Sequence, residues 1–380
     1  MKTHSLIIGI PLEIKNDEQR VAATPETVKK MLNLGCKVWV QKGAGARASI
    51  TDSAYQAVGA EIVSAKVVFN ANLILKVRAP EPAEIKAMKW GTVLIGLLEP
   101  FNVAQLNAIA IQGITAFSLE ALPRNSRAQS MDVLSSQANV AGYKAVLLGS
   151  HFYQRFMPML MTSAGTVKAA RVLILGAGVA GLQAIATARR LGAVVEASDV
   201  RPAVKEQVES LGAKFLEVPF ETTEEEEIAA GVGGYARPMP SQWMERQAAL
   251  VAQRAAEADI VITSALIPGR EPPILLHAET IEKMKPGSVV IDMAAGFGAK
   301  GCGNCPLTEP NQIVVKHDVT IVGYTNLPSL VAADASAFYA RNILEFLKLL
   351  ITEDKFNAPS DDELVTATLM CRDGKLIQNK

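Results

Sequence analysis

Three glycines near the middle of the chain have the spacing of a phosphate-binding turn. Residues 171–181 read Arg-Val-Leu-Ile-Leu-Gly-Ala-Gly-Val-Ala-Gly, so an apolar run leads directly into the pattern Gly176-x-Gly178-x-x-Gly181. The first glycine permits a tight turn, the second lets a pyrophosphate approach the backbone, and the third allows close helix–strand packing. Unpaired N–H groups at the start of the following helix, from Val179, favour phosphate. A strand before the pattern and a helix after it predict a dinucleotide site.

An acidic residue ends the next predicted strand, 194–198. The carboxylate of Asp199 can accept hydrogen bonds from ribose hydroxyls and would repel a 2′-phosphate, so the expected cofactor is NAD(H). Arg201, two residues on and next to Val200, leaves NADP(H) open as an alternative, because an arginine can accommodate a 2′-phosphate. A glycine-rich turn without a ligand is the other alternative, against which the strand, the spacing and the acid count together.

A second polar cluster lies at 124–137, which reads Arg-Asn-Ser-Arg-Ala-Gln-Ser-Met-Asp-Val-Leu-Ser-Ser-Gln. Its guanidinium, amide, carboxylate and hydroxyl groups suit hydrogen bonding to a carboxamide and a ribose, without an evident acid–base pair. Helix capping alone would account for Ser126 or Ser130, but not also for Arg124 and Gln129. We therefore expect this cluster, at the start of a long helix, to face the cofactor.

Oxidation of an alcohol or an amine would require a general base near the nicotinamide, most often His or Lys. The histidines are His4, His151, His277 and His317, and none lies on a turn that follows a strand of the first half. Lys76, at the carboxyl end of a predicted strand, is better placed, although a solvated lysine is an equal interpretation.

Strand and helix patterns alternate along almost the whole chain, which predicts parallel sheets with helices on both faces. Strands are expected at 5–10, 37–41, 72–77, 91–98, 114–119, 171–175, 194–198, 259–264, 288–292, 312–315 and 319–323. Helices are expected from Thr24-Pro25 to Gly35, near 81–89, and at 102–112, 128–156, 179–191, 203–211 and 330–350.

The predicted fold class is α/β, with two Rossmann-like parallel-sheet domains separated by a cleft and joined by long helices. The N-terminal domain would comprise residues 1–127 plus 328–380, and the NAD(H)-binding domain residues 128–327. We expect the polar tail, 352–380, to be peripheral. Residues 219–242, with an acidic run and several Gly and Pro, are expected to lack regular structure, as a functional loop or a solvated insertion.

The overall composition is neutral and favours buried cores. Lys and Arg together number 38, Asp and Glu together number 38, and 49% of the residues are hydrophobic. No basic excess points to nucleic acid as a partner. We see no apolar run that could span a bilayer, no signal peptide and no disulfide framework among four cysteines, and so expect a soluble intracellular chain.

Several strings closely resemble one family. Residues 126–143, Ser-Arg-Ala-Gln-Ser-Met-Asp-Val-Leu-Ser-Ser-Gln-Ala-Asn-Val-Ala-Gly-Tyr, resemble the NAD(H)-binding first component (domain I, the soluble part of the alpha subunit) of proton-translocating NAD(P)+ transhydrogenases. The likeness extends from residue 1 to about 350. Further similar strings are Gly-Ala-Gly-Val-Ala-Gly-Leu-Gln-Ala-Ile-Ala-Thr-Ala (176–188), Ser-Asp-Val-Arg (198–201), Gly-Gly-Tyr-Ala (233–236), Thr-Ser-Ala-Leu-Ile-Pro-Gly (263–269) and Gly-Asn-Cys-Pro-Leu (303–307).

The resemblance implies roles for individual residues. Arg124 and Ser135 would hold the nicotinamide carboxamide, and Asp132 would hold its ribose. Gln129 would lie at the approach to the partner's nicotinamide. Tyr235 would sit on a mobile lid, 219–242, that closes over NAD(H). The remaining implied cofactor contacts are Asn125, Ser126, Arg127, Gly234, Gln247 and Leu266.

The resemblance also implies the reaction and its partners. Hydride would pass directly between the C4 atoms of NAD(H), bound here, and NADP(H), bound on a partner component, in the manner of the re/si-specific enzymes. Such a transfer requires positioning rather than proton handling. A membrane-spanning component would couple it to proton translocation, and the chain would act as a homodimer, active only with its partners. It would be cytoplasmic, peripheral on the inner face of the cell membrane.

Two other functions stay open. The same fold occurs in alanine dehydrogenase, whose substrate-binding residues would fall at Arg20 and Lys76. However, this chain has Leu98-Glu99 where that enzyme carries its catalytic His. A non-catalytic NAD(H)-binding regulatory subunit is the third hypothesis.

Two segments depart from the family pattern. The loop after Asp292 is longer and contains Cys302-x-x-Cys305. One such pair, without a second pair or a His, is poor evidence for zinc, and we expect no metal site. The lid is also longer and more acidic.

Overall fold

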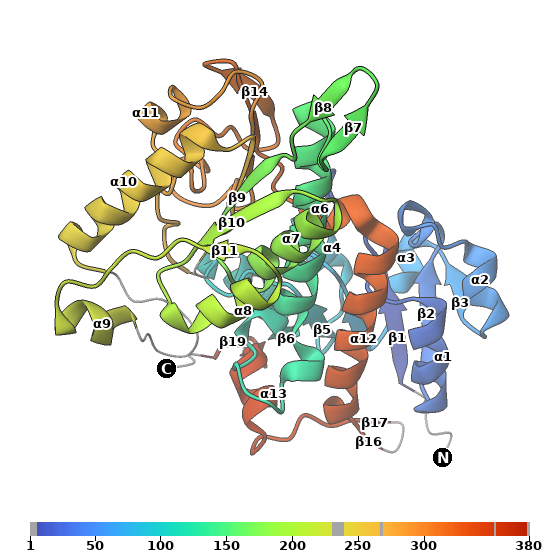
Figure 1. Cartoon of the computed structure of the whole chain (residues 1–380). Helices are drawn as coiled ribbons and strands as arrows, with labels where there is room; N and C mark the ends of the chain where they lie inside the picture. The colour runs from blue at the N-terminus through green and yellow to red at the C-terminus, as the bar shows by residue number, and fades with distance from the viewer. Residues whose placement is uncertain (1–5, 230–238, 267–268, 353–354, 378–380) are drawn as a thin grey trace, which may run out of the picture. The chain divides into compact units, whose positions relative to one another are not determined.

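The computed structural model describes residues 6–229, 239–266, 269–352 and 355–377. The chain forms two compact units, which we call unit 1 (Met1–Gln137 with Pro328–Lys380) and unit 2 (Ala138–Leu327) (Figure 1). Each unit has its own parallel-dominated sheet with flanking helices, so the predicted α/β class with two Rossmann-like sheets is confirmed.

The sheet of unit 1 has the order β3-β2-β1-β4-β5-β6-β18-β19. Strands β1 to β6 are parallel, and β18 and β19 are antiparallel additions at one edge. The strands are β1 (Ile7–Ile10), β2 (Lys37–Gln41), β3 (Glu61–Val63), β4 (Leu73–Leu75), β5 (Val93–Gly96), β6 (Thr115–Ser118), β18 (Leu369–Arg372) and β19 (Lys375–Leu376). The helices are α1 (Pro25–Asn33), α2 (Asp52–Ala57), α3 (Ala65–Val68), α4 (Pro82–Ala87), α5 (Val103–Ile111), α12 (Ala332–Leu350) and α13 (Glu363–Thr368).

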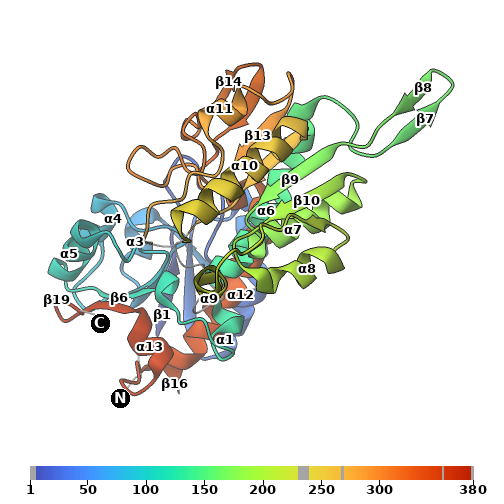
Figure 2. The ribbon, with the colours of Figure 1, turned by 60° about the vertical axis from the view of Figure 1, so that its left-hand side comes forward.

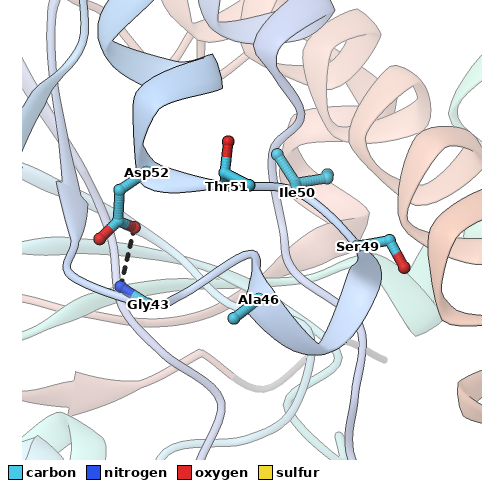
Figure 3. A pocket seen from close by; sticks show the side chains of 6 residues that line it. All are labelled: Gly43, Ala46, Ser49, Ile50, Thr51 and Asp52. Atoms are coloured by element: carbon cyan, nitrogen blue, oxygen red, sulfur yellow. Dashed lines mark hydrogen bonds between the residues drawn. The ribbon is translucent and has the colours of Figure 1, made fainter.

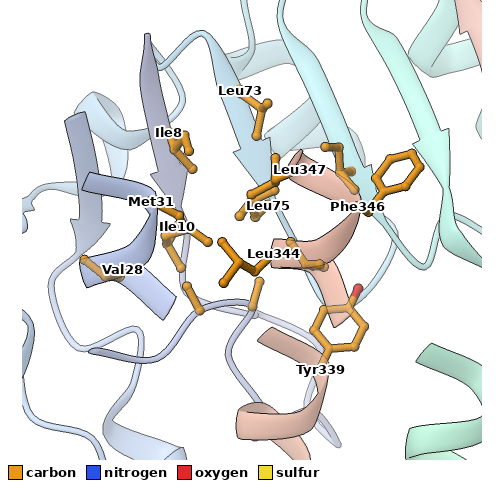
Figure 4. Packing of buried hydrophobic residues seen from close by; sticks show 14 of the residues in the cluster. Ile8, Ile10, Val28, Met31, Leu73, Leu75, Tyr339, Leu344, Phe346 and Leu347 are labelled. Atoms are coloured by element: carbon orange, nitrogen blue, oxygen red, sulfur yellow. The ribbon is translucent and has the colours of Figure 1, made fainter. Parts of the chain in front are cut away.

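Local signals explain where the first helix begins. Thr24 is the N-cap of α1, with a capping box to Thr27, and Pro25 occupies the first turn, as the sequence predicted. The core of unit 1 is built largely by α12, which returns from the far end of the chain. Leu344 and Leu347 pack on the apolar faces of β1 and β4 (Figure 4).

The sheet of unit 2 has the order β11-β10-β9-β12-β13-β15-β14, parallel except for β14. The strands are β9 (Arg171–Leu175), β10 (Val194–Ser198), β11 (Lys214–Phe215), β12 (Ile260–Thr263), β13 (Val289–Asp292), β14 (Ile313–Lys316) and β15 (Val319–Val322). The helices are α7 (Val179–Arg190), α8 (Lys205–Ser210), α9 (Thr223–Ala229), α10 (Ser241–Glu257) and α11 (Ala278–Ile281). A hairpin of β7 (Leu160–Thr162) and β8 (Gly165–Val167) projects from this unit (Figure 2).

Two differences between the predicted and the observed helices bear on the site. The long helix α6 is Val133–Tyr153 and not 128–156, because residues 129–131 form a separate 3₁₀ turn. The acidic run in 219–242 was expected to lack regular structure, but Glu224 to Glu227 lie within α9, where Arg246 pairs with Glu225. Acidic side chains in the first turn stabilise a helix through its macrodipole, and the ion pair with Arg246 stabilises α9 further.

The tail is an integral part of unit 1, which corrects the expectation that it is peripheral. Strand β18 pairs with β6, and Leu364 and Cys371 are fully buried. The buried side chains are apolar residues that stand between the charged residues of the tail. The polar overall composition of the tail gave no indication of them. The tail therefore covers the edge of β6 and extends the sheet by two strands.

Replacing Leu364 with Ala tests the role of the tail. We expect a loss of roughly 2–5 kcal/mol in unfolding free energy, since a large buried side chain is removed. Urea unfolding followed by circular dichroism measures this. Ile377→Ala, at a position 37% exposed, is the matched control and should change stability little. Equal, small effects of the two changes would show that α13 is not part of the core.

Candidate dinucleotide site

Strand register in unit 2 brings three turns together. Leu175, the last residue of β9, is paired with Ser198 on one side and with Thr263 on the other. The residues that follow these strand ends therefore meet at the carboxyl edge of the sheet. Chain order reverses between β9 and β12, and this switch point is where open α/β sheets bind ligands.

The glycine turn has the geometry that a pyrophosphate needs. Gly176 has φ +99°, which favours glycine, and its N–H donates to the Ser198 carbonyl at 2.9 Å. A Cβ at Gly181 would lie 1.9 Å from the Gly176 carbonyl oxygen, so no other residue allows α7 this close. At Gly178, by contrast, a Cβ would meet no atom within 4 Å, and the space is open above the N-terminus of α7. Val179 begins that helix and is 41% exposed.

The carboxylate of Asp199 already has four donors. Its Oδ1 accepts from the N–H and Nε of Arg201 at 2.9 Å each, and its Oδ2 accepts from the Ala177 N–H and the guanidinium of Arg201 at 2.8 Å each. An ionised carboxylate offers about four such positions. A ribose hydroxyl would therefore replace part of the Arg201 pairing. The NADP(H) alternative required the Arg201 guanidinium to bind a 2′-phosphate, and that guanidinium is paired with Asp199 here.

The turn after β12 is held from two sides. The hydroxyl of Ser264 donates to the Gly176 carbonyl at 3.0 Å, and the side-chain amide of Asn304 donates to the Ala265 carbonyl at 2.8 Å. Leu266, which lies on this turn, is half-buried. Sequence reasoning did not single out Ser264 or Asn304, although both stand within strings that resembled the family.

Asp292 organises the long loop that follows β13. Its buried carboxylate accepts hydrogen bonds from Thr263, Ala294, Asn304, Cys305 and Thr308, at 2.9 to 3.1 Å. Burial raises the pKa of this carboxyl, and the hydrogen bonds from Thr308, Asn304, Ala294 and Thr263 oppose that shift. Burial also raises the pKa of the Cys305 thiol to about 11, so this cysteine is a packed thiol rather than a reactive one.

The residues that flank the central part of the predicted lid pack beside the site. Val200 contacts a small apolar cluster that includes Ala229 and Met239, the residues on either side of 230–238. Gln247, on α10, is buried. The predicted lid residues Gly234 and Tyr235 lie outside the described residues.

The predicted nicotinamide cluster lies in unit 1. Asp132 and Ser135 are brought together, since Asp132 accepts from the Ser135 N–H at 2.9 Å and from its hydroxyl at 2.5 Å. This contact caps the start of α6. Arg124, Ser126 and Gln129 have exposed side chains.

Two members of this cluster are engaged by the tail. Arg127 pairs with Asp362, and the side-chain amide of Asn125 donates to Glu363 at 3.0 Å. These acidic partners were missed by sequence reasoning. The run Ser360-Asp-Asp-Glu before an apolar stretch is a helix-start signal, from which the start of α13 could have been predicted. The signal does not indicate that these acids pair with Asn125 and Arg127.

The residues of the alanine dehydrogenase alternative are buried ion pairs. The ammonium of Lys76 lies 2.8 Å from the Glu84 carboxylate and 3.2 Å from that of Glu13, and the guanidinium of Arg20 donates two hydrogen bonds to Glu18. Their positive charges are thus balanced within unit 1, as buried charges require. Glu99, where the resemblance places the dehydrogenase His, has φ +58°, and its carboxylate lies 3.5 Å from the ammonium of Lys15.

A shallow pocket of about 290 Å³ also lies in unit 1, between Gly43 and Asp52 (Figure 3). The Asp52 carboxylate accepts from the Gly43 N–H at 2.9 Å, and none of the predicted site residues lines this pocket. Across the ranges that the structure describes, no group of three His, Cys, Asp or Glu is arranged to hold a metal. Within those same ranges, no helix is long and apolar enough to cross a membrane.

The two sheets, the glycine turn and Asp199 define a two-unit Rossmann-type dinucleotide-binding protein. The chain belongs to the alanine dehydrogenase/PNT family: the model of its N-terminal domain matches residues 9–141, and that of its C-terminal domain matches residues 145–379.

Similarity to proteins within this family is uneven. The chain is 50% identical to the first part of NAD(P) transhydrogenase subunit alpha of Rhodospirillum rubrum, over 97% of both chains. It is 28% identical to alanine dehydrogenase of Bacillus subtilis, over 97% of this chain and 92% of that one. The solved structure of a transhydrogenase from Sinorhizobium meliloti superposes with a TM-score of 0.85 at 44% identity, covering 98% of each chain. An L-alanine dehydrogenase superposes with 0.78 at 26% identity, covering 98% of this chain and 97% of that one.

The role of Asp199 can be tested with Asp199→Asn. We expect roughly tenfold weaker NADH binding, because a charge-assisted acceptor is lost. Discrimination against NADPH should also fall, because Arg201 loses its carboxylate partner. Titration with both nucleotides measures this, with Glu217→Gln, an exposed acid paired with Lys205, as control. Unchanged selectivity would contradict the ribose assignment.

Proposed function

We propose that this chain is the NAD(H)-binding component of a proton-translocating transhydrogenase. The observation that carries the proposal is the combination of the Gly176–Gly181 turn and Asp199 with 50% identity to the first segment of a transhydrogenase alpha subunit over 97% of the chain. The family resemblance alone would equally permit an amino-acid dehydrogenase, and the difference between 50% and 28% identity favours transhydrogenase.

Unit 2 holds NAD(H) in this proposal. The N–H groups at the start of α7 bind the pyrophosphate over the open space at Gly178, and Asp199 binds the adenosine ribose. Gln247 and Leu266 line the cofactor. Ala229 and Met239 pack with Val200, so the two described residues that flank 230–238 both lie near Asp199. Gly234 and Tyr235 on that segment then act as the lid.

The chemistry supplied by the bound cofactor is direct hydride transfer to or from NADP(H) on a separate component, with re/si stereospecificity. Neither nicotinamide loses a proton when the hydride passes between them, so the reaction needs no general base from this chain. Glu99, where the resemblance places the dehydrogenase His, is in keeping with this. Arg124 and Ser135 orient the carboxamide, Asp132 orients the ribose, and Gln129 controls the approach of the partner. Proximity and orientation supply the rate.

The partners follow from the same proposal. A membrane-spanning component couples hydride transfer to proton translocation, and this chain lies on the cytoplasmic face through its partners. A homodimer is supported by the projecting β7–β8 hairpin and the segment that leads into it: Met161 on β7 is 75% exposed, and Phe156 and Met159, which precede β7, are 56% and 60% exposed. Contiguous exposed apolar side chains mark interaction sites.

Introducing a charge on the hairpin tests the homodimer. Met161→Lys should raise the proportion of monomer, because a lysine ammonium resists burial. Sedimentation over a range of concentrations measures this, and Lys168→Met is not expected to raise it. A wild-type chain that stays monomeric at all concentrations would contradict the dimer.

The central experiment mixes the purified chain with an NADP(H)-binding transhydrogenase component and follows transfer from NADPH to a spectroscopically distinct NAD+ analogue. Gln129→Asn should slow transfer roughly tenfold, because the shorter side chain misplaces the partner. NADH affinity should change by less than about twofold. Gln56→Asn, the same change at an exposed site on α2, is the control.

The alternatives have distinct outcomes in this assay. If binding of NADH collapses in Gln129→Asn, then Gln129 is a structural residue. No transfer by the wild-type chain, together with alanine-dependent NADH formation, would support the dehydrogenase. NADH binding with neither activity would support a regulatory subunit.

A further inference from the structure

The segment 124–136 is held in place by residues from the far end of the chain. Four of its residues bond to partners that lie between 206 and 238 positions downstream, all within unit 1. The segment has little regular structure of its own before Val133, apart from the 3₁₀ turn. Its conformation therefore depends on these distant contacts.

The tail supplies the first pair of contacts. The two terminal guanidinium nitrogens of Arg127, Nη1 and Nη2, donate to the carboxylate of Asp362, Nη1 at 3.3 Å. Beside this pair, Asn125 donates its side-chain N–H to Glu363 at 3.0 Å and accepts the Ala128 N–H at 2.9 Å with its side-chain oxygen. Two parallel N–H···O bonds fix the relative orientation of the guanidinium and the carboxylate as well as the distance between them.

The position of Asp362 is itself fixed by the start of α13. Asp362 is the N-cap of α13 and accepts the N–H of Leu364 at 2.9 Å and that of Val365 at 3.3 Å. Leu364 and Val365 are 0% and 2% exposed, so the start of α13 is anchored in the core. The Arg127 guanidinium holds the pKa of the Asp362 carboxyl below its usual range, so the pair stays charged at neutral pH.

Helix α12 supplies the second pair. Asn342 donates to the Ser130 carbonyl at 2.7 Å and accepts the hydroxyl of Ser136 at 2.7 Å. Gln129 therefore lies between an anchor at Arg127 and an anchor at Ser130. Its backbone is held on both sides while its side chain is exposed.

We propose that Asp362 and Glu363 are positioning residues for hydride transfer, and that Asn125 and Arg127 act through them rather than by contact with the cofactor. The tail then keeps Arg124 and Gln129 in the geometry that the second nicotinamide requires. This inference rests on the proposed transhydrogenase function. It reassigns two residues that the family resemblance placed among the cofactor contacts.

Single substitutions at the pair test the inference in the full chain, mixed with an NADP(H)-binding component. Asp362→Asn keeps an N-cap acceptor for α13 but removes the charge that Arg127 needs. We expect hydride transfer to slow roughly three- to tenfold, since small misplacements reduce rates steeply. The dissociation constant for NADH should stay within about twofold of wild type, because no cofactor contact is removed. Arg127→Gln should reproduce both results.

Conservative and double variants separate positioning from general destabilisation. Glu363→Gln keeps an oxygen acceptor for Asn125 and should retain most of the rate, whereas Glu363→Ala should lower it. The double variant Arg127→Gln/Asp362→Asn should be no slower than either single variant, because both remove the same pair. Glu345→Gln removes an exposed ion pair to Lys348 on α12 and serves as the control for rate and thermal stability.

Each outcome has one meaning. Transfer by the wild type with an equal rate in Asp362→Asn would overturn the inference and leave the proposed function intact. Weakened NADH binding in Arg127→Gln alone would show that Arg127 contacts the cofactor, which also overturns it. No transfer by the wild type, despite NADH binding, would overturn the proposed function instead.

Discussion

The candidate site depends on how closely α7 approaches the end of β9. A Cβ at Gly181 would lie 1.9 Å from the carbonyl oxygen of Gly176, a distance that only glycine permits. This approach directs the N-terminal N–H groups of α7 toward the open space at Gly178. The register of Ser198, Leu175 and Thr263 then places the neighbouring turns on either side of it. Without that approach, the N-terminal N–H groups of α7 and Asp199 would not share one edge of the sheet.

Two carboxylates then organise the turns around this approach. Asp199 accepts four hydrogen bonds from the glycine turn and Arg201, while Asp292 accepts five from Thr263 and the following loop. Asp199 follows the parallel strand β10 and Asp292 is the last residue of the parallel strand β13, so both lie where backbone N–H groups converge. Buried or half-buried acids are stable there only because those donors satisfy them. The candidate site thus consists of turns whose backbone N–H groups donate to the carboxylates of Asp199 and Asp292. Neither carboxylate belongs to a catalytic acid–base pair.

In unit 1, too, polar side chains hold a loop in place, and here they come from the second of the two chain segments that form the unit. The loop before α6 is held by Asn342 on α12 and by Asp362 and Glu363 on α13. Because α12 and β18 are also part of the core and the sheet, the loop is attached to the most buried part of the unit. A surface segment acquires a defined conformation in this way despite few contacts of its own.

Sequence patterns predicted most of the strands because parallel strands buried on both faces read as continuous apolar runs. The ranges 171–175 and 194–198 coincide with β9 and β10, and the start of α1 follows its Thr-Pro signal. Helix α9 and the tail were misjudged, because their stability comes from Arg246 and from pairing with β6 rather than from local composition. Local signals do not contain that information.

The glycine spacing, the following acid and the polar 124–135 string are local properties, and the sequence alone was sufficient to indicate a dinucleotide site from them. Tertiary structure decided which donors occupy Asp199 and which partners hold Asn125 and Arg127. The physical reason is sequence distance. A turn is encoded by neighbouring residues, whereas Arg127 and Asp362 are 235 positions apart and meet only when the tail packs into the sheet of unit 1.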